Sequence, residues 1–360
     1  MIKLIRKLPW ALFPTIFALA WPTMLEQLLH TAVQYIDTAM VGSLGTEATA
    51  AVGSTTTVNW LISSTISAIG VGFLAYISQS RGAGKHAEAR RAVGQAVFIV
   101  LVLGIFFTAL TLLISPVVPA LMQVEEGLRK TSAIYFFILY TPMLFRTASI
   151  IFGTVLRSAG DTKTPMLVGI LVNIVNVVLN FFLIYQTRLI VIGNFFLLIP
   201  GAGLGVIGAG IASAVSFAVG GVIITIALFR HKEISPRGVS IKPDFKILKP
   251  CFKVAFPNAL QRFGTSGGYV VFASMINSIG GVSTAAHTIA NTVESAFYVP
   301  GYGMQSASAT LCACAYRCRA FDGARSCDQG GRAGHDGDCA TDPLSRCRKS
   351  RDERAGKTNL

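Results

Sequence analysis

Long uninterrupted apolar runs dominate the chain, and they limit what it can fold into. A spanning α-helix needs about 20 predominantly apolar residues. Runs of that kind lie near 10–41, 49–78, 92–121, 131–156, 164–185, 204–229, 250–279 and 284–311. Closed β-barrels also span membranes, but they are built from short strands of alternating polarity, and these runs are continuous. The sequence therefore predicts an all-α, polytopic membrane protein with eight spanning helices.

The charges support this class and predict an orientation. Only 13% of the residues are charged, against about 25% in soluble domains. The net charge of +14 could suggest a nucleic-acid partner, but sixteen Lys and Arg lie at the N-terminus and in the loops after helices 2, 4 and 6, against three in the other loops. That asymmetry is the positive-inside pattern. We expect a multi-pass protein of the inner or plasma membrane with a cytoplasmic N-terminus and no nucleic-acid partner. The first run, which could also be a signal peptide, is interpreted as a retained helix because it lacks a small-residue cleavage site.

The composition changes abruptly at Cys312. Residues 312–360 contain no Ile, Val or Trp, but they hold six of the seven cysteines. The cysteine spacings do not match the paired short spacings of structural zinc sites, so we predict no metal site. This composition is that of an out-of-frame translation of a GC-rich gene. We expect a disordered tail after about residue 311 and a longer native protein.

A weak internal repeat indicates how the helices are grouped. The segment "WPTMLEQ" at Trp21 aligns with "FPNALQR" at Phe256, an offset of 235 residues. Further matches join Gly45 to Gly280 and, at an offset of 231, Gly70 to Gly301. A parallel repeat of this kind occurs in two-lobe transporters. The predicted domains are an N-lobe of six helices (1–229), a basic inter-lobe loop (230–249), a partial second lobe of two helices (250–311) and the tail (312–360).

Polar residues inside the apolar runs are the candidate site. Asp37 stands in "LHTAVQYIDTAMVGSLG", where burying an unpaired carboxylate is costly. In "LVNIVNVVLNFFLIY", residues Asn173, Asn176 and Asn180 recur at spacings of three and four, so one helical face carries all three. Two interpretations stay open: a polar cavity that binds substrate and coupling ions, or structural hydrogen bonds between helices.

Other intramembrane polar residues are secondary candidates. Glu26 and Gln27 lie two to three turns before Asp37, and His287 lies seven residues before Glu294, on roughly the same face of one predicted helix. Glu294 and His287 could pair or relay a proton. Arg146 and Arg262 are expected in structural ion pairs. We find no nucleotide-binding loop, zinc-protease motif or nucleophile elbow, so we expect neither an enzyme nor a transporter driven by ATP hydrolysis on this chain.

Three segments together resemble the multidrug and toxic compound extrusion (MATE) family. They are "YIDTAMVGSLG" followed by "AAVG"; "LRSAGDTKTPM" leading into the Asn-rich helix; and "AAHTIANTVESAFYVPGYGMQSASATL". The resemblance covers about residues 20–311. It implies a twelve-helix fold of two six-helix lobes, of which this chain carries the first lobe and the start of the second.

The resemblance also implies a function. The family exports organic cations and drugs in exchange for protons or sodium, so we expect an antiporter of cationic or amphipathic small molecules. It needs no cofactor beyond the coupling ion, and we expect a monomer in membrane lipid. Asp37 matches the ion-coupling aspartate, Asn176 and Asn180 match polar cavity positions, and Glu294 lies in a family motif; proton-coupled relatives carry aspartate at the position of Asn180. The alternatives are a flippase of lipid-linked or amphipathic substrates and a non-functional fragment, and we expect the chain as written not to transport.

Overall fold

The structure is a computed structural model that describes residues 13–121, 126–192 and 195–279, together with 298, 301, 304 and 305. Its helices and strands are α2 (Phe13–Gly42), α3 (Thr46–Gly82), α4 (His86–Ile114), α5 (Val118–Leu121), α6 (Glu126–Tyr140), α7 (Met143–Ser158), α8 (Lys163–Ile184), β1 (Gln186–Ile192), β2 (Phe195–Ala202), α9 (Gly205–Arg230) and α10 (Phe245–Ile279). The predicted all-α class is confirmed, with one hairpin added. The predicted helix at 284–311 lies mostly outside the described residues, and the predicted tail lies entirely outside them.

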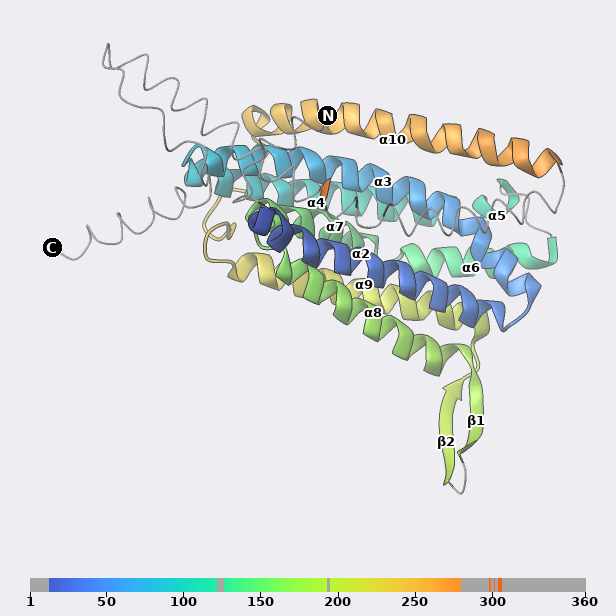
Figure 1. The fold of residues 1–360 in the computed structure, drawn as a ribbon. Helices are drawn as coiled ribbons and strands as arrows, with labels where there is room; N and C mark the ends of the chain where they lie inside the picture. The colour runs from blue at the N-terminus through green and yellow to red at the C-terminus, as the bar shows by residue number, and fades with distance from the viewer. Residues whose placement is uncertain are drawn as a thin grey trace, which may run out of the picture.

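The helices run side by side as a bundle. α8 packs against α9 and α2, while α7 packs against α9, α4 and α3. α10 packs along α3 at one side of this bundle (Figure 1). The core between the helices contains Phe73, Phe136, Tyr140 and Ile151, each at most 2% exposed. Six of the predicted spans, counting α6 and α7 as one, therefore form one packed unit, and α10 lies against its α3 side.

The fourth predicted span is broken rather than continuous. α6 and α7 meet at an angle of 49° across Thr141 and Pro142. Proline has no N–H to donate, so an uninterrupted helix through Pro142 would lose a backbone hydrogen bond. α7 begins at the next residue, and the Phe145 amide donates to the Pro142 carbonyl at 3.0 Å. α6 and α7 together therefore form one bent candidate span.

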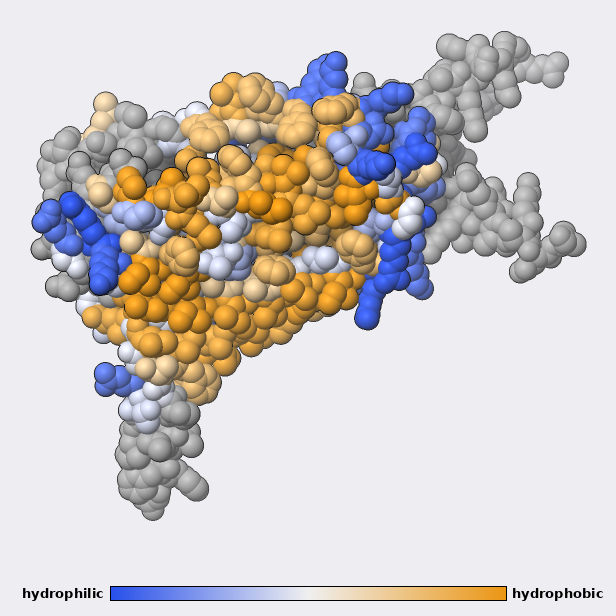
Figure 2. All heavy atoms as spheres, turned by 180° about the vertical axis from the view of Figure 1, so that it is seen from behind, coloured by the Kyte–Doolittle hydropathy of each residue, from blue (hydrophilic) through white to orange (hydrophobic). Residues whose placement is uncertain are grey.

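Much of the surface of the bundle is apolar. In the part of the chain that the structure describes, four helices are long and apolar enough to cross a membrane alone (the second half of α3, α4, α8 and α9), and the bent pair would be a fifth. α2 and α10 are long enough, but they carry more polar side chains. Large apolar side chains such as Ile105, Leu113 and Leu167 are more than half exposed. Figure 2 shows a broad hydrophobic zone on the face in view, with hydrophilic side chains at its two ends.

A hairpin follows α8, where no secondary structure was predicted. Its two strands pair antiparallel, with Ile192 opposite Phe195. The hairpin projects from one end of the bundle, away from the end where the inter-lobe loop lies (Figure 1). The Tyr185 hydroxyl at the foot of this connection lies 3.0 Å from the Ser43 hydroxyl at the end of α2. The hairpin therefore starts from a point where α2 and α8 are already joined.

Small residues let α9 approach its neighbours closely, as the run "GAGIASAVSFAVGG" predicts. A Cβ atom at Gly221 would lie 2.4 Å from the carbonyl oxygen of Phe145 on α7. A Cβ atom at Gly208 would lie 2.5 Å from the carbonyl oxygen of Leu183 on α8. Real Cβ atoms do not come that close to a carbonyl oxygen, so glycine sets the spacing between these helices.

Candidate functional site

The contact between α2 and α8 brings Asp37 to the Asn-rich face. Asp37 lies five residues before the end of α2 and is half-buried. The Asn180 amide nitrogen donates to its carboxylate at 2.6 Å. Asn180 is 1% exposed and Asn176 is 6% exposed, so both amides point into the bundle. The two amides predicted from sequence to share a face therefore meet the predicted carboxylate.

Asn176 lies between this carboxylate and α9. With its amide nitrogen turned toward Asp37, the nitrogen lies 2.8 Å and 3.1 Å from the two carboxylate oxygens, and the amide oxygen accepts from the Ser213 hydroxyl at 3.2 Å. The opposite orientation would place the amide oxygen against the carboxylate oxygens, which is repulsive. The first orientation is therefore the one that suits an ionised Asp37. The cluster then joins three helices, α2, α8 and α9.

The cluster is rich in oxygen acceptors. Besides the two Asp37 oxygens, it contains the Asn180 amide oxygen, which is buried and has no hydrogen-bond partner among the described residues. Buried polar atoms are nearly always hydrogen-bonded or coordinated, so an unpaired one beside a carboxylate calls for a donor or a cation. A proton or a small hard cation would satisfy it. Among the residues that the structure describes, no three His, Cys, Asp or Glu side chains come together as a metal site.

A second carboxylate of α2 is held in an ion pair. Both oxygens of Glu26 on α2 accept from one guanidinium nitrogen of Arg157 on α7, at 2.6 Å and 2.7 Å. The two side chains are about one-fifth exposed, and a Cβ atom at Gly169 on α8 would lie only 3.3 Å from the Glu26 side chain. Glu26 is therefore engaged in an ion pair, while the adjacent Gln27 is exposed and its side chain makes no hydrogen bond to a described residue.

Arg146 is held without a carboxylate among the described residues. It donates to the Ser63 hydroxyl at 2.9 Å, and its guanidinium carbon lies 4.6 Å from the centre of the Phe217 ring. Its second terminal nitrogen is buried and has no partner among the described residues. Arg262 on α10 donates to Asn258 at 3.1 Å. The ion pairs that we predicted for both arginines are not formed within the described part of the chain.

The remaining predicted site residues do not join the cluster. Asn173 is half-buried and makes no hydrogen bond to the described residues. Glu294 and His287 lie outside the described residues. The sequence analysis missed two partners of the candidate residues. Ser213, the partner of Asn176, lies in a run of small residues that was interpreted only as a packing surface. Arg157, the partner of Glu26, was interpreted only as a loop charge.

Comparison with known proteins identifies the family. The MatE family model matches residues 22–182 and 257–327. The chain belongs to the MatE family. The two matches start at Pro22 and Pro257, which is the 235-residue offset of the internal repeat. The second match extends past Cys312, to residue 327.

Curated MatE relatives carry drug-resistance names. A probable multidrug resistance protein NorM of Thermotoga maritima is 29% identical over 293 residues, which are 81% of this chain and 61% of the relative. A probable multidrug resistance protein YoeA of Bacillus subtilis is 24% identical over 84% of this chain and 64% of the relative. The chain thus spans less than two thirds of the length of these relatives.

Solved MatE structures share the fold. A crystal structure of MATE in complex with MaD3S superimposes with a TM-score of 0.76 at 24% identity, covering 86% of this chain and 67% of that one. An outward-facing multidrug resistance MATE transporter of the MOP superfamily gives a TM-score of 0.75 at 24% identity, covering 86% of this chain and 66% of that one. The bundle described above is therefore a MatE lobe with the start of a second.

Proposed function

We propose that the native protein is a secondary antiporter that exports organic cations or amphipathic drugs in exchange for protons or sodium. The observation that carries the proposal is Asp37, a carboxylate of α2 that accepts hydrogen bonds from Asn180 and Asn176. Ionisable groups inside a membrane are costly, and in transporters they mark ion and substrate pathways. The names of the relatives, multidrug resistance proteins, support the drug part of the proposal.

The geometry suggests how exchange would work. An ionised Asp37 is stabilised by two amide N–H donors, and it keeps room for a positive partner because it is only half-buried. A proton or sodium ion that binds there removes the negative charge to which a cationic drug would be attracted. The two cations then compete for one site, and this competition couples their opposite movements. The Asn180 amide oxygen, buried and unpaired among the described residues, would accept from a protonated Asp37 or bind the sodium ion.

The test is gradient-driven export. We also propose that the native chain is longer, and we expect a full-length form, made by restoring the reading frame after the Leu311 codon, to export ethidium from an efflux-deficient host. Export should stop when the coupling gradient is collapsed: a proton uncoupler stops proton exchange, and sodium-free medium stops sodium exchange. The 360-residue chain, expressed to the same level, should not export. Equal export by both chains would contradict the need for the longer form, and export that survives both treatments would contradict the antiporter.

Arg146 supports the alternative function, a flippase or exporter of lipid-linked or amphipathic substrates. Its guanidinium lies in the same bundle as Asp37, without a carboxylate partner among the described residues. A phosphate-bearing substrate would need such a cation, usually several. Export of ethidium that survives Arg146→Gln favours the antiporter, and export of a fluorescent phosphate-bearing lipid that is lost in this variant favours the alternative.

We further propose that the N-terminus and the inter-lobe loop are cytoplasmic, in the inner or plasma membrane. In a cysteine-free background, single cysteines at Leu44 and Gly127 should react with an impermeant thiol reagent in intact cells. Cysteines at Arg237 and Lys249, at the other end of the bundle, should react only after the cells are permeabilised. The sixteen basic residues of the N-terminus and of the loops after helices 2, 4 and 6, against three in the other loops, motivate this orientation. The reverse labelling pattern would overturn it.

A further inference from the structure

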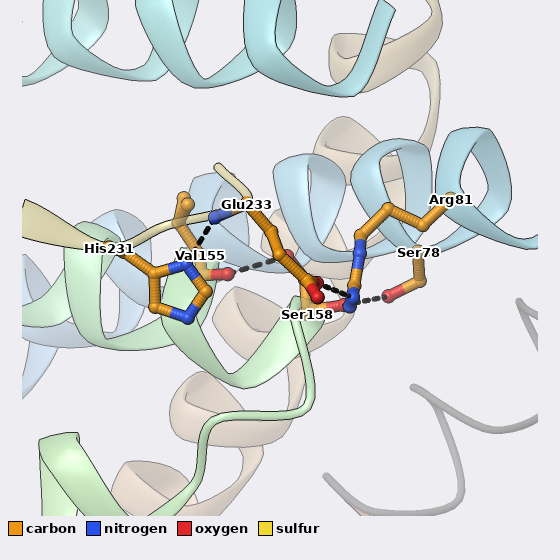
Figure 3. A network of polar contacts seen from close by, with 6 residues as sticks. All are labelled: Ser78, Arg81, Val155, Ser158, His231 and Glu233. Carbon is orange, nitrogen blue, oxygen red and sulfur yellow. Dashed lines mark hydrogen bonds and ion pairs between the residues drawn. The ribbon is translucent and has the colours of Figure 1, made fainter. Parts of the chain in front are cut away.

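The loop between the two lobes, residues 231–244, is fastened to the first lobe. Figure 3 shows Arg81, at the end of α3, reaching Glu233 of this loop at 2.5 Å. Arg81 and Ser78 also donate to the Ser158 carbonyl at the end of α7, each at 3.4 Å. Ile234, the next residue of the loop, is 1% exposed. The loop thus begins against the ends of α3 and α7.

Two side chains of α4 hold the rest of the loop. Arg90 donates to the carbonyls of Ser235 and Arg237 at 3.1 Å and 2.9 Å. Gln95 is 2% exposed; its amide donates to the Lys242 carbonyl at 2.7 Å and accepts from the Asp244 amide at 2.9 Å. These two hydrogen bonds pair the Gln95 side chain with the loop backbone in the way that a neighbouring β-strand would. The loop is therefore held at both its start and its end.

A cleft of about 580 Å³ lies between the loop and α4. Its lining includes three cations, Arg90, Arg91 and Lys242, and one carboxylate, Asp244. The carboxylate already accepts from the Lys246 amide at 2.9 Å. The side chains of Arg91 and Lys242 make no hydrogen bond or ion pair with any described residue, so their charges remain available. The cleft is consequently cationic and is preformed by the bonds of Arg90 and Gln95.

Exposed apolar side chains lie beside the cleft in sequence. Two large apolar side chains on either side of Lys242 and Asp244, Ile241 and Phe245, are 45% and 78% exposed. Further along α4, Leu101 and Ile105 are also exposed. A ligand here meets cations inside the cleft and apolar surface beside it. That combination fits a phosphate group attached to acyl chains better than a free anion.

We propose that this cleft binds the phosphate headgroup of an anionic phospholipid. Arg91 and Lys242 contact the phosphate, and Ile241 and Phe245 lie against the lipid below it. Each cation beside an anionic lipid surface strengthens binding by roughly fivefold, so the two together account for a factor of about 30. The bound lipid bridges α4 and the inter-lobe loop.

The test measures lipid retention by the 360-residue chain, purified in detergent, using native mass spectrometry with added phosphatidylglycerol or phosphatidylcholine. We expect phosphatidylglycerol to bind preferentially. Arg91→Gln with Lys242→Gln should weaken this binding at least tenfold. Lys232→Gln with Lys249→Gln removes the same charge from two exposed positions outside the cleft and should change it less than twofold. Equal losses in both double variants would mean diffuse attraction and would overturn the site.

A second variant separates shape from charge. Ala87 is exposed in the lining of the cleft, and Ala87→Trp fills the space without altering any charge. We expect it to weaken phosphatidylglycerol binding as much as the charge variant does, and unchanged binding would overturn the proposal. If the charge variant fails to fold, Ala87→Trp still tests whether the lipid binds in the cleft. Displacement of the lipid by millimolar inorganic phosphate would show that a free anion is the ligand. Binding of phosphatidylcholine as strongly as phosphatidylglycerol would show that the cleft does not select an anion. Either result would refute the assignment.

Discussion

Replacing Asp37 with asparagine is expected to reduce ethidium export by the full-length form to the level of cells without the protein. Asparagine keeps the shape of the side chain and removes the charge for which the coupling ion and the drug compete. It also presents an amide to Asn180 and Asn176, whose nitrogens now donate to the carboxylate at 2.6 Å and 2.8 Å. The measurement is initial export rate in inverted membrane vesicles, at matched amounts of inserted protein.

Neighbouring asparagines supply the control. Asn180→Ala removes a direct donor to Asp37, and we expect export to fall at least tenfold, the scale of one lost hydrogen bond to a charged group. Asn173→Ala removes an amide from the same helix that bonds to no described residue, and we expect near-normal export. Wild-type export by the Asp37 variant, or equal losses at positions 180 and 173, would contradict the cluster as the coupling site.

The second large effect is expected from Gly221→Ala. The new Cβ would lie 2.4 Å from the Phe145 carbonyl oxygen and 2.5 Å from its Cβ, so α7 and α9 must separate along this contact. Overpacking typically costs 1–3 kcal/mol, and more where backbone cannot yield, so we expect a loss of about 3 kcal/mol. Heating the detergent-solubilised chain and following the monodisperse fraction by size-exclusion chromatography should show a transition several degrees lower.

Gly264→Ala is the matched control. It makes the same substitution within a helix, α10, where a Cβ would have no neighbour within 4 Å. Alanine is the better helix former by about 1 kcal/mol, so this variant should be equally or slightly more stable than the wild type. An unchanged transition in Gly221→Ala, beside an unchanged control, would show that α7 and α9 do not pack as described.

The sequence predicted the helices well because an apolar run long enough to cross a bilayer is a strong signal that can be recognised locally. Predicted bounds such as 164–185 and 204–229 differ from α8 and α9 by one residue at each end. The hairpin was missed because the search was for runs long enough to span. Its own signal was present: two short apolar segments, "LIVI" and "FFLLI", flank Gly193 and Asn194, a dipeptide typical of hairpin turns.

The candidate site was predictable only in part. Spacing alone places Asn176 and Asn180 on one face, and an isolated carboxylate marks Asp37, but their meeting depends on the packing of α2 against α8. Ser213 comes from a third helix, where one hydroxyl among many small residues carries no distinguishing pattern. The pair of Glu26 with Arg157 joins residues 131 positions apart, and no local periodicity reports such a distance.

Because the inter-lobe loop is bound to the first lobe, it provides no free length of chain between the two lobes. The loop is bound to the first lobe as far as Asp244, and α10 begins at the next residue. In the antiporter that we propose, a rocking motion of one lobe against the other would therefore not be absorbed by uncoiling that loop. It must bend α10 itself, which contains Pro250 and Pro257, two places where a helix lacks backbone hydrogen bonds and yields most readily. The first turns of α10 would thus travel with the first lobe while the remainder moves with the second.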